Sequence, residues 1–322
     1  MFEATRLTFY YAVTPVHMGA GSAIGAIDNP IQREVHTQHP VFAGSGLKGA
    51  LRHHFNRAWP GEKEKKNAGL IGRIFGPETD ASDFAGALSL SDAQLVALPA
   101  RSLNGAYAYA TCPLALARLK RLAELAEVKA DWKIPQPKGE QGNEPAQAMV
   151  TLNSGVVSGN RLILEAFEFI KVEVSEAQAV AEWLAKHAVP GDAGHEFFGK
   201  KIGTDLVILT DTDFAHFARH AMVVEPHVRI DDDSGTADDG GLFYTENLPP
   251  ESVLAGLTQA TVERVKKGEK EKEKIPAGKV LDAVFDGAGD GKPGIADKLL
   301  QIGGDATAGR GLVLVHPVKE EG

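Results

Sequence analysis

The pattern of apolar and polar positions predicts strands and helices along most of the chain. Runs rich in β-branched and aromatic residues predict strands, and apolar residues spaced three and four apart predict helices. We expect strands at residues 5–15, 86–99, 160–174 and 205–210. We expect helices at residues 44–59, 113–128, 175–188 and 211–221. Residues 299–318 predict the end of a helix, a glycine loop and a last strand.

Three of these helices carry residues that are typical of helix starts. Ser45 is the expected N-cap of the first helix, because its hydroxyl can accept a hydrogen bond from a free backbone N–H. Pro113 begins the second helix at a position that favours proline. Asp211 or Asp213 is the expected cap of the helix at 211–221.

Three further segments differ in composition from the predicted helices and strands. Residues 227–251 predict a β-hairpin arm, because strand-like ends flank an acidic tip that contains glycine. Residues 133–147 are polar and rich in proline and glycine, which predicts a mobile insertion. Residues 266–274 read KKGEKEKEK and predict a charged, solvated run. No repeat is found, and the order of elements favours an α+β domain with a ferredoxin-like core and several insertions.

Composition limits the class of protein. The chain has 322 residues, 43% of them hydrophobic, so it is long enough to bury a large core. We expect a soluble, cytoplasmic protein without a membrane partner, because no apolar run is long enough to span a bilayer and the N-terminus does not resemble a signal peptide. A single cysteine, Cys112, excludes an internal disulfide. The net charge of −9 argues against a protein that coats bare nucleic acid, but it allows a local basic groove.

One carboxylate stands out in the glycine-rich stretch GAGSAIGAIDNP at residues 19–30. Asp28 precedes Asn29 and Pro30, a combination that is common in ordinary Asx-turns. The residues before it have almost no side-chain bulk, which leaves room for another backbone to approach. A carboxylate in such a place can bind Mg²⁺ while water and phosphate oxygens complete the coordination shell. Both interpretations remain open from the residues alone.

Several segments, taken in order, resemble a known family. TPVHMGAGSAIGAIDNPIQRE, GSGLKGALR and the C-terminal QIGGDATAGRG resemble the RAMP proteins of CRISPR systems. The segments at 110–120, 206–221 and 228–251 resemble the repeated backbone subunit of the type III-B (Cmr) effector complex. The similarity extends from about residue 5 to residue 316, and the order of the motifs makes it specific.

The resemblance implies a single RAMP domain over residues 1–322. Its fold is expected to be α+β, with a ferredoxin-like (RRM-like) palm, helical insertions and a β-hairpin thumb. The expected divisions are a palm at about 5–60, 86–130, 160–222 and 295–318, a mobile insertion at about 133–147, a thumb-like hairpin at about 223–251, and a charged insertion at about 264–292.

The resemblance also implies a function. Such subunits stack as copies of one another into a helical filament along a CRISPR guide RNA, together with a large polymerase/cyclase-like subunit and a small subunit. They present the guide to a complementary target RNA and cut the target at regular intervals with a divalent metal, Mg²⁺ or Mn²⁺. Asp28 is implied to be both the catalytic residue and the metal ligand, and the product end a 2′,3′-cyclic phosphate.

His17 and a set of polar and aromatic residues are the other candidate site residues. His17 is either a structural histidine, an acid for the leaving 5′-oxygen or a phosphate contact. The glycine loop lacks the Lys-Ser/Thr of a P-loop, and no metal-ligand spacing such as HExxH occurs among the histidines. The candidate RNA contacts are Gln32, Arg33, Ser45, Lys48, Arg52, Gly303, Gly304, Arg310, Arg229, Phe243, Tyr244 and Glu246.

Each group of candidates also has an ordinary structural interpretation. In these interpretations, the residues of the helix at 44–59 form a solvated face, and the glycine loop at 303–311 is a tight connection. The hairpin is then an ordinary hairpin with an acidic, soluble tip. Three alternative functions follow: a structural RNA-binding subunit without catalysis, a metal-free RAMP nuclease that processes CRISPR precursor RNA, and a glycine-loop nucleotide-binding enzyme.

Overall fold

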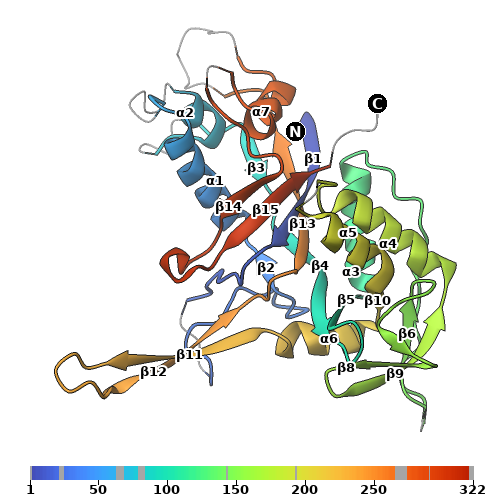
Figure 1. Ribbon diagram of the computed structural model, residues 1–322. Helices are drawn as coiled ribbons and strands as arrows, with labels where there is room; N and C mark the ends of the chain where they lie inside the picture. Colours follow the sequence, from blue (N-terminus) through green and yellow to red (C-terminus); the bar gives the residue numbers. More distant parts are fainter. Residues whose placement is uncertain are drawn as a thin grey trace.

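The fold is a mixed α+β fold around one large, mostly antiparallel sheet (Figure 1). The computed structural model describes residues 2–21, 25–62, 69–78, 84–142, 144–192, 194–264, 274–289 and 291–318. Of the predicted charged run at 266–274, only Lys274 lies among the described residues.

Thirteen strands form the large sheet. They are β1 (Ala4–Ala12), β2 (Val41–Phe42), β3 (Leu88–Leu90), β4 (Ala93–Arg101), β5 (Tyr107–Thr111), β6 (Gln147–Val150), β7 (Val157–Ser158), β8 (Arg161–Leu164), β9 (Phe167–Glu173), β10 (Leu206–Ile208), β13 (Val253–Ala260), β14 (Lys298–Gln301) and β15 (Leu312–Pro317). The order along the sheet is β14-β15-β1-β13-β4-β5-β10-β6-β9-β8-β7, with β2 paired to β4 and β3 to β13.

The helices cover both faces of this sheet. They are α1 (Gly44–Ala58), α2 (Leu70–Phe75), α3 (Pro113–Leu125), α4 (Ser175–His187), α5 (Glu196–Asp205), α6 (Asp211–His220), α7 (Ala277–Phe285) and the short 3₁₀ helix η2 (Ala306–Ala308). None of the helices in the described residues combines the length and hydrophobicity that a membrane span requires.

Strand β1 shows why the core has two halves. Its side chains alternate between the faces of the sheet, as the pleat requires. Phe9 and Tyr11 belong to a buried cluster with residues of α3, α4 and α5. Tyr10 and Ala12 belong to the other cluster, with residues of α1, α2 and α7. Figure 1 shows these two helix groups on opposite sides of the sheet.

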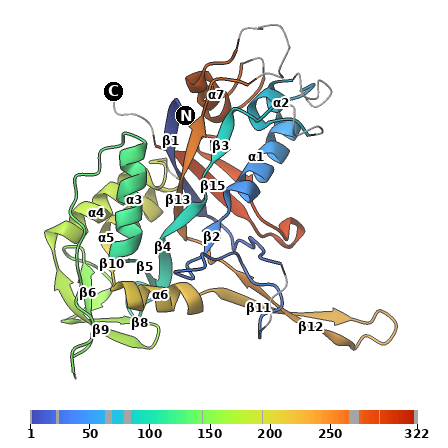
Figure 2. The same cartoon turned by 180° about the vertical axis from the view of Figure 1, so that it is seen from behind.

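Two further strands, β11 (Val223–Ile230) and β12 (Ala237–Asn247), form a separate two-stranded sheet. This arm, residues 223–247, confirms the predicted hairpin. It projects from the body and follows directly on α6 (Figure 2). Its chain returns to the body through β13, which pairs with β1.

Several sequence predictions about local structure are wrong. The predicted strand at 160–174 is two strands, β8 and β9, because Glu165 takes a left-handed turn conformation with φ of 52°. Residues 298–301 form the strand β14 rather than the end of a helix. Within the predicted charged insertion at 264–292, residues 277–285 form the buried helix α7. The predicted insertion at 133–147 agrees better: no helix or strand occurs among its described residues before Gln147, where β6 begins.

The predicted helix caps are also wrong. Ser45 lies inside α1, and the Gly44 N–H at the helix start donates to the Asp92 carboxylate at 2.8 Å. The cap of α6 is Thr210, whose hydroxyl accepts from the Asp213 N–H. Asp211 instead accepts from the backbone N–H of Leu114 at the start of α3. Asp92 is distant in sequence from α1, whereas Thr210 directly precedes α6, and Pro113 begins α3 as predicted.

A chain of buried hydroxyl groups begins at Glu251, between the arm and β13. Tyr11 donates a hydrogen bond to Glu251, and the hydroxyls of Tyr11 and Tyr109 lie 3.0 Å apart. Burial raises the pKa of Glu251 to about 7. The folded state therefore favours the neutral carboxyl group.

This shift predicts how stability changes with pH. Between pH 4.5, the pKa of an unperturbed glutamate, and about pH 7, the unfolded chain ionises at this residue while the folded chain does not, so the stability it contributes is lost as pH rises. Glu251→Gln cannot ionise. We expect its Tm to exceed that of the wild type by about 2 °C at pH 8, or about 1 kcal/mol after a discount for partial exposure, with no gain at pH 4. Calorimetry checks this, with the exposed Glu144→Gln as control; an equal gain at both pH values would contradict it.

Candidate functional site

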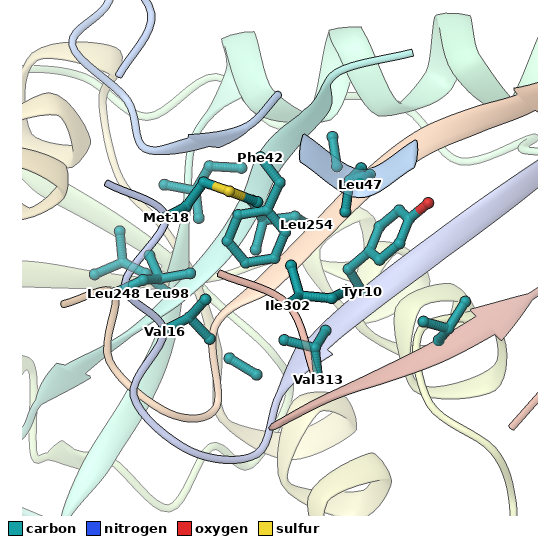
Figure 3. Packing of buried hydrophobic residues seen from close by; sticks show 14 of the residues in the cluster. Tyr10, Val16, Met18, Phe42, Leu47, Leu98, Leu248, Leu254, Ile302 and Val313 are labelled. Atoms are coloured by element: carbon teal, nitrogen blue, oxygen red, sulfur yellow. The ribbon is translucent and has the colours of Figure 1, made fainter. Parts of the chain in front are cut away.

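The first loop, residues 13–40, connects β1 to β2 and carries His17 and Asp28. Its base is anchored in the core, where Val16 and Met18 pack near Phe42 and Leu248 (Figure 3). The side-chain amide of Gln32 donates to the Gly19 carbonyl at 3.0 Å and ties the two sides of the loop together. The loop therefore has a fixed base, while Asp28 is exposed to solvent.

Asp28 lies against the arm. Its Oδ2 accepts a hydrogen bond from the backbone N–H of Tyr244 in β12, at 2.8 Å. The neighbouring Asn29 pairs with β12 as a short ladder, with its N–H donating to the Tyr244 carbonyl and its carbonyl accepting from the Glu246 N–H. Asp28 is thus held by backbone groups at the root of the arm. Its Oδ1 has no hydrogen-bond partner among the described residues.

Glu246 joins the same strand to the first loop from inside the protein. It is only 4% exposed. Its Oε1 accepts from Arg33 at 2.5 Å, and its Oε2 accepts from the Ile31 N–H at 3.0 Å. Arg33 also donates to the Ala218 carbonyl of α6 at 2.8 Å. The charges of Arg33 and Glu246, both predicted to contact RNA, are thus paired with each other in the interior of this structure.

His17 contacts β12 of the arm at Glu246, two residues beyond Tyr244, which binds Asp28. Its Nδ1 lies 2.8 Å from the carbonyl oxygen of Glu246. A carbonyl oxygen can only accept, so Nδ1 must carry the proton in the neutral ring. Nε2 is then the nitrogen with the free lone pair, and it is directed toward Gly19, where a Cβ would lie only 2.9 Å from it. The contact with the Glu246 carbonyl therefore indicates the Nδ1–H tautomer of neutral His17, with Nε2 beside Gly19.

The glycine loop, residues 302–311, supports His17 from the other side. The Gly304 N–H donates to the His17 carbonyl at 2.8 Å, and a Cβ on Gly303 would come within 2.4 Å of that oxygen. Gly303 is required for this close approach. Arg310 is paired with Glu225 of β11. These contacts favour the interpretation of this loop as a tight connection.

The candidates on α1 lie beside the first loop, because the first turn of α1 packs against Met18 at Gly46. Ser45 is exposed there. Lys48 donates to the Leu88 carbonyl and Arg52 to the Gly76 carbonyl, each at 2.9 Å. Burial lowers the pKa of the Lys48 ammonium, and the charges of Arg52 and Arg264 lower it further. The negative charge of a phosphate beside Lys48 would offset the repulsion between Lys48, Arg52 and Arg264.

The arm has two different faces, because cross-strand pairs share a face. On one face, Phe243 stacks on His227 with ring centroids 5.0 Å apart, and Arg229 lies 3.8 Å from Asp238 farther along the arm. The other face is mostly apolar and carries Val224, Pro226, Val228, Ile230, Ala237, Leu242 and Tyr244, with Glu246 opposite Val224 at the root of the arm. Phe243 and Tyr244 remain 36% and 37% exposed.

The residues around Asp28 fit a metal that is held mainly by other groups. Among the described residues, no cluster of three or more histidine, cysteine, aspartate or glutamate side chains is placed to bind a metal ion. Mg²⁺ commonly binds through one or two carboxylates and takes its other ligands from water and substrate phosphates. The single exposed carboxylate of Asp28 is compatible with that kind of site.

Sequence analysis missed Glu225, the partner of Arg310. The two residues are 85 positions apart, so no local pattern connects them. It also missed the backbone N–H of Tyr244 as the partner of Asp28, since backbone groups leave no signal in a sequence. The structure brings His17, Asp28, the arm and the glycine loop to one place, with the α1 candidates beside it.

Comparison with protein families and curated sequences gives consistent results. The RAMP superfamily profile matches residues 9–314 of the chain. The CRISPR system Cmr endoribonuclease Cmr4 of Pyrococcus furiosus is 34% identical over 307 residues, which cover 95% of this chain and 92% of the relative. The CRISPR system CMR subunit Cmr4 of Saccharolobus solfataricus is 23% identical over 260 residues, covering 76% and 81%.

Solved structures of similar fold cover nearly the whole chain. The crystal structure of oligomeric Cmr4 from Pyrococcus furiosus aligns with a TM-score of 0.66 and 27% identity over 99% of both chains. A chain in the cryo-EM structure of the type III-B Cmr-beta complex bound to cognate target RNA aligns with a TM-score of 0.68 over 98% of both chains. Its identity is 17%, so this second likeness concerns the fold alone.

Proposed function

The chain belongs to the RAMP superfamily, and on this premise we propose that it is a guide-RNA-binding backbone subunit of a type III-B CRISPR effector complex. It stacks with copies of itself and joins the large polymerase/cyclase-like subunit and the small subunit. The support comes from relatives that are named as Cmr subunits. An oligomeric crystal structure of a relative supports self-assembly.

We infer that the palm is ferredoxin-like. Its four central strands have the order β15-β1-β13-β4, and all neighbours are antiparallel. Helix α1 follows β1, and α7 lies between β13 and β15. This βαββαβ arrangement agrees with a split βαβ core. The arm is the thumb of this proposal, and its apolar face suits insertion between bases of an RNA strand.

The protein is also, in this proposal, a metal-dependent endoribonuclease that cuts the target RNA at regular intervals through Asp28. One observation carries the assignment: an exposed carboxylate is fixed by the Tyr244 N–H at the root of the projecting arm. An arm that unstacks a target nucleotide, at a cost of a few kcal/mol, would present the distorted phosphate next to this carboxylate.

The reaction forms a bond between the RNA 2′-oxygen and phosphorus and breaks the bond to the 5′-oxygen, which leaves a 2′,3′-cyclic phosphate. A bound divalent metal would neutralise phosphate charge and promote loss of the 2′-hydroxyl proton. Asp28 would hold that metal. His17, when protonated at Nε2, would give its proton to the leaving 5′-oxygen, while its Nδ1 hydrogen bond to Glu246 keeps the ring in place.

We propose that the Gly303 backbone amide, Ser45, Lys48, Arg52 and Gln32 lie along the guide, where the α1 cations and the loop backbone meet phosphate. The Gly304 N–H is already bound to the His17 carbonyl and is not part of this contact. Arg229, Phe243 and Tyr244 of the arm meet bases and the target strand. These contacts read the shape and backbone of RNA, and base pairing supplies sequence specificity. An acidic protein can bind RNA in this way, because the contact surface is local.

Metal removal tests the proposed function. We expect the complex assembled with guide RNA to cut a complementary target at evenly spaced positions in Mg²⁺, to lose at least about 100-fold in rate with EDTA, and to recover with Mn²⁺. Gel analysis of end-labelled target RNA provides the measurement, and a non-complementary RNA is the control. Cleavage that survives chelation would favour a metal-free RAMP nuclease, and guide-dependent binding without cleavage would favour a structural subunit.

A further inference from the structure

The arm is braced by an ion pair that lies close to the candidate cleavage site. Arg310 of the glycine loop places one guanidinium nitrogen 2.5 Å and 2.6 Å from the two carboxylate oxygens of Glu225 in β11. The side chains are 24% and 26% exposed, so water screens this pair only partly. Asn247 of β12 also donates to Glu225, at 3.4 Å.

Glu225 is well placed to influence the cleavage site. It lies opposite Thr245 in the register of the arm. The two neighbours of Thr245 make the contacts of the site: the Tyr244 N–H binds Asp28, and the Glu246 carbonyl binds His17. A shift of β11 at Glu225 is therefore passed to the segment of β12 that holds both side chains.

The glycine loop can act as the fixed side of the Arg310–Glu225 ion pair, which we call the brace. It connects β14 and β15, which belong to the body sheet. Its backbone binds the first loop twice, with the Gly304 N–H donating to the His17 carbonyl and the Gly311 N–H to the Pro15 carbonyl, each at 2.8 Å. The arm, in contrast, is a two-stranded sheet outside the body sheet, and such ribbons are weakly stable alone.

We propose that Arg310 and Glu225 are positioning residues: their ion pair holds the root of the arm against the glycine loop and so fixes Asp28 and His17 for cleavage. This inference rests on the proposed function. It replaces the sequence interpretation of Arg310 as a direct partner of guide phosphates, because the guanidinium group is turned to Glu225. A displacement of about 1 Å at a reacting group can cost about 100-fold in rate, so a modest brace has a large effect.

Cleavage by the assembled complex tests the brace. We expect Glu225→Gln and Arg310→Gln each to slow single-turnover cleavage about 10-fold while guide RNA affinity stays unchanged. The double variant is expected to be no slower than either single variant, because both changes remove one interaction. The charge-swapped variant, Glu225→Arg with Arg310→Glu, is expected to recover most of the rate. Asp238→Asn removes the ion pair with Arg229 farther out on the same arm and is the matched control.

A distance measurement tests the brace without any cleavage. Cys112 is the only cysteine and is buried, so spin labels can be placed at Ser234→Cys on the arm tip and Ser158→Cys on the body. We expect a narrow distance distribution in this doubly labelled protein and a broader one after Glu225→Gln. Unchanged distances, unchanged cleavage in both single variants, or a loss of guide affinity confined to Arg310→Gln would overturn the proposal. Absence of cleavage in the wild-type complex counts against the proposed function alone, since the distances still decide the brace.

Discussion

Asp28→Asn is expected to abolish target cleavage while the complex still assembles on guide RNA. The amide keeps the size of the carboxylate but loses its charge and most of its affinity for a divalent cation. Because Oδ2 accepts from the Tyr244 N–H, the amide oxygen can take over that hydrogen bond and keep the loop in place. We expect the single-turnover rate to fall by at least about 100-fold, the scale on which a group acting directly on the reaction contributes.

The comparison needs variants that leave the site intact. Asp239→Asn removes an exposed carboxylate at the arm tip and is expected to cleave at the wild-type rate. Normal cleavage by Asp28→Asn at every position of the target would return Asp28 to the role of a turn residue. In the same assay, a His17→Ala protein with the normal rate would remove His17 from the proposed chemistry.

Arg33→Met is expected to be the most destabilising of the substitutions considered, because it leaves the buried carboxylate of Glu246 without its counter-charge. The side chains of Arg33 and Glu246 are 16% and 5% exposed. Breaking one partner of a buried pair costs about 3–5 kcal/mol. The substitution also weakens the attachment of the first loop, because Glu246 accepts from the Ile31 N–H and Arg33 donates to the Ala218 carbonyl. Urea unfolding measures the change in free energy.

Arg161→Met is the matched control for this experiment. Arg161 and Glu168 form an ion pair at 2.6 Å whose side chains are 48% and 50% exposed. Exposed pairs contribute about 0–1 kcal/mol, so this variant should unfold close to the wild type. Equal losses of unfolding free energy in Arg33→Met and Arg161→Met would show that burial does not determine how much the Arg33–Glu246 pair contributes to stability.

Asp28, Arg33 and Glu246 all contact the segment of chain where the first loop meets β12. Asp28 is the proposed catalytic residue, and its carboxylate is held by a backbone hydrogen bond to β12. Arg33 and Glu246 provide no proposed chemistry, but they hold the same strand against the first loop. The residues expected to have the largest effects on stability and on cleavage are therefore different members of one small contact network.

The periodicity of the sequence was sufficient to predict the helices and strands whose form depends little on tertiary contacts. Helices α3 and α4 and strand β1 follow from residue spacing, because the faces of an isolated helix or strand are set by local geometry. The arm follows from an acidic, glycine-containing turn between strand-like segments. Periodicity failed at residues 160–174, where one apolar run is divided by a turn at Glu165 that carries no glycine or proline.

The sequence by itself determined the α+β class, the hairpin and a lone carboxylate in a stretch of small residues, because these depend on neighbours within a few positions. Only the tertiary structure decided the roles of the charged candidates. Arg33 meets Glu246 across 213 positions, and Arg310 meets Glu225 across 85. A charged side chain looks the same in a sequence whether it faces solvent, RNA or a buried partner. The fold decides between these, because an ion taken out of water must be paired with another group.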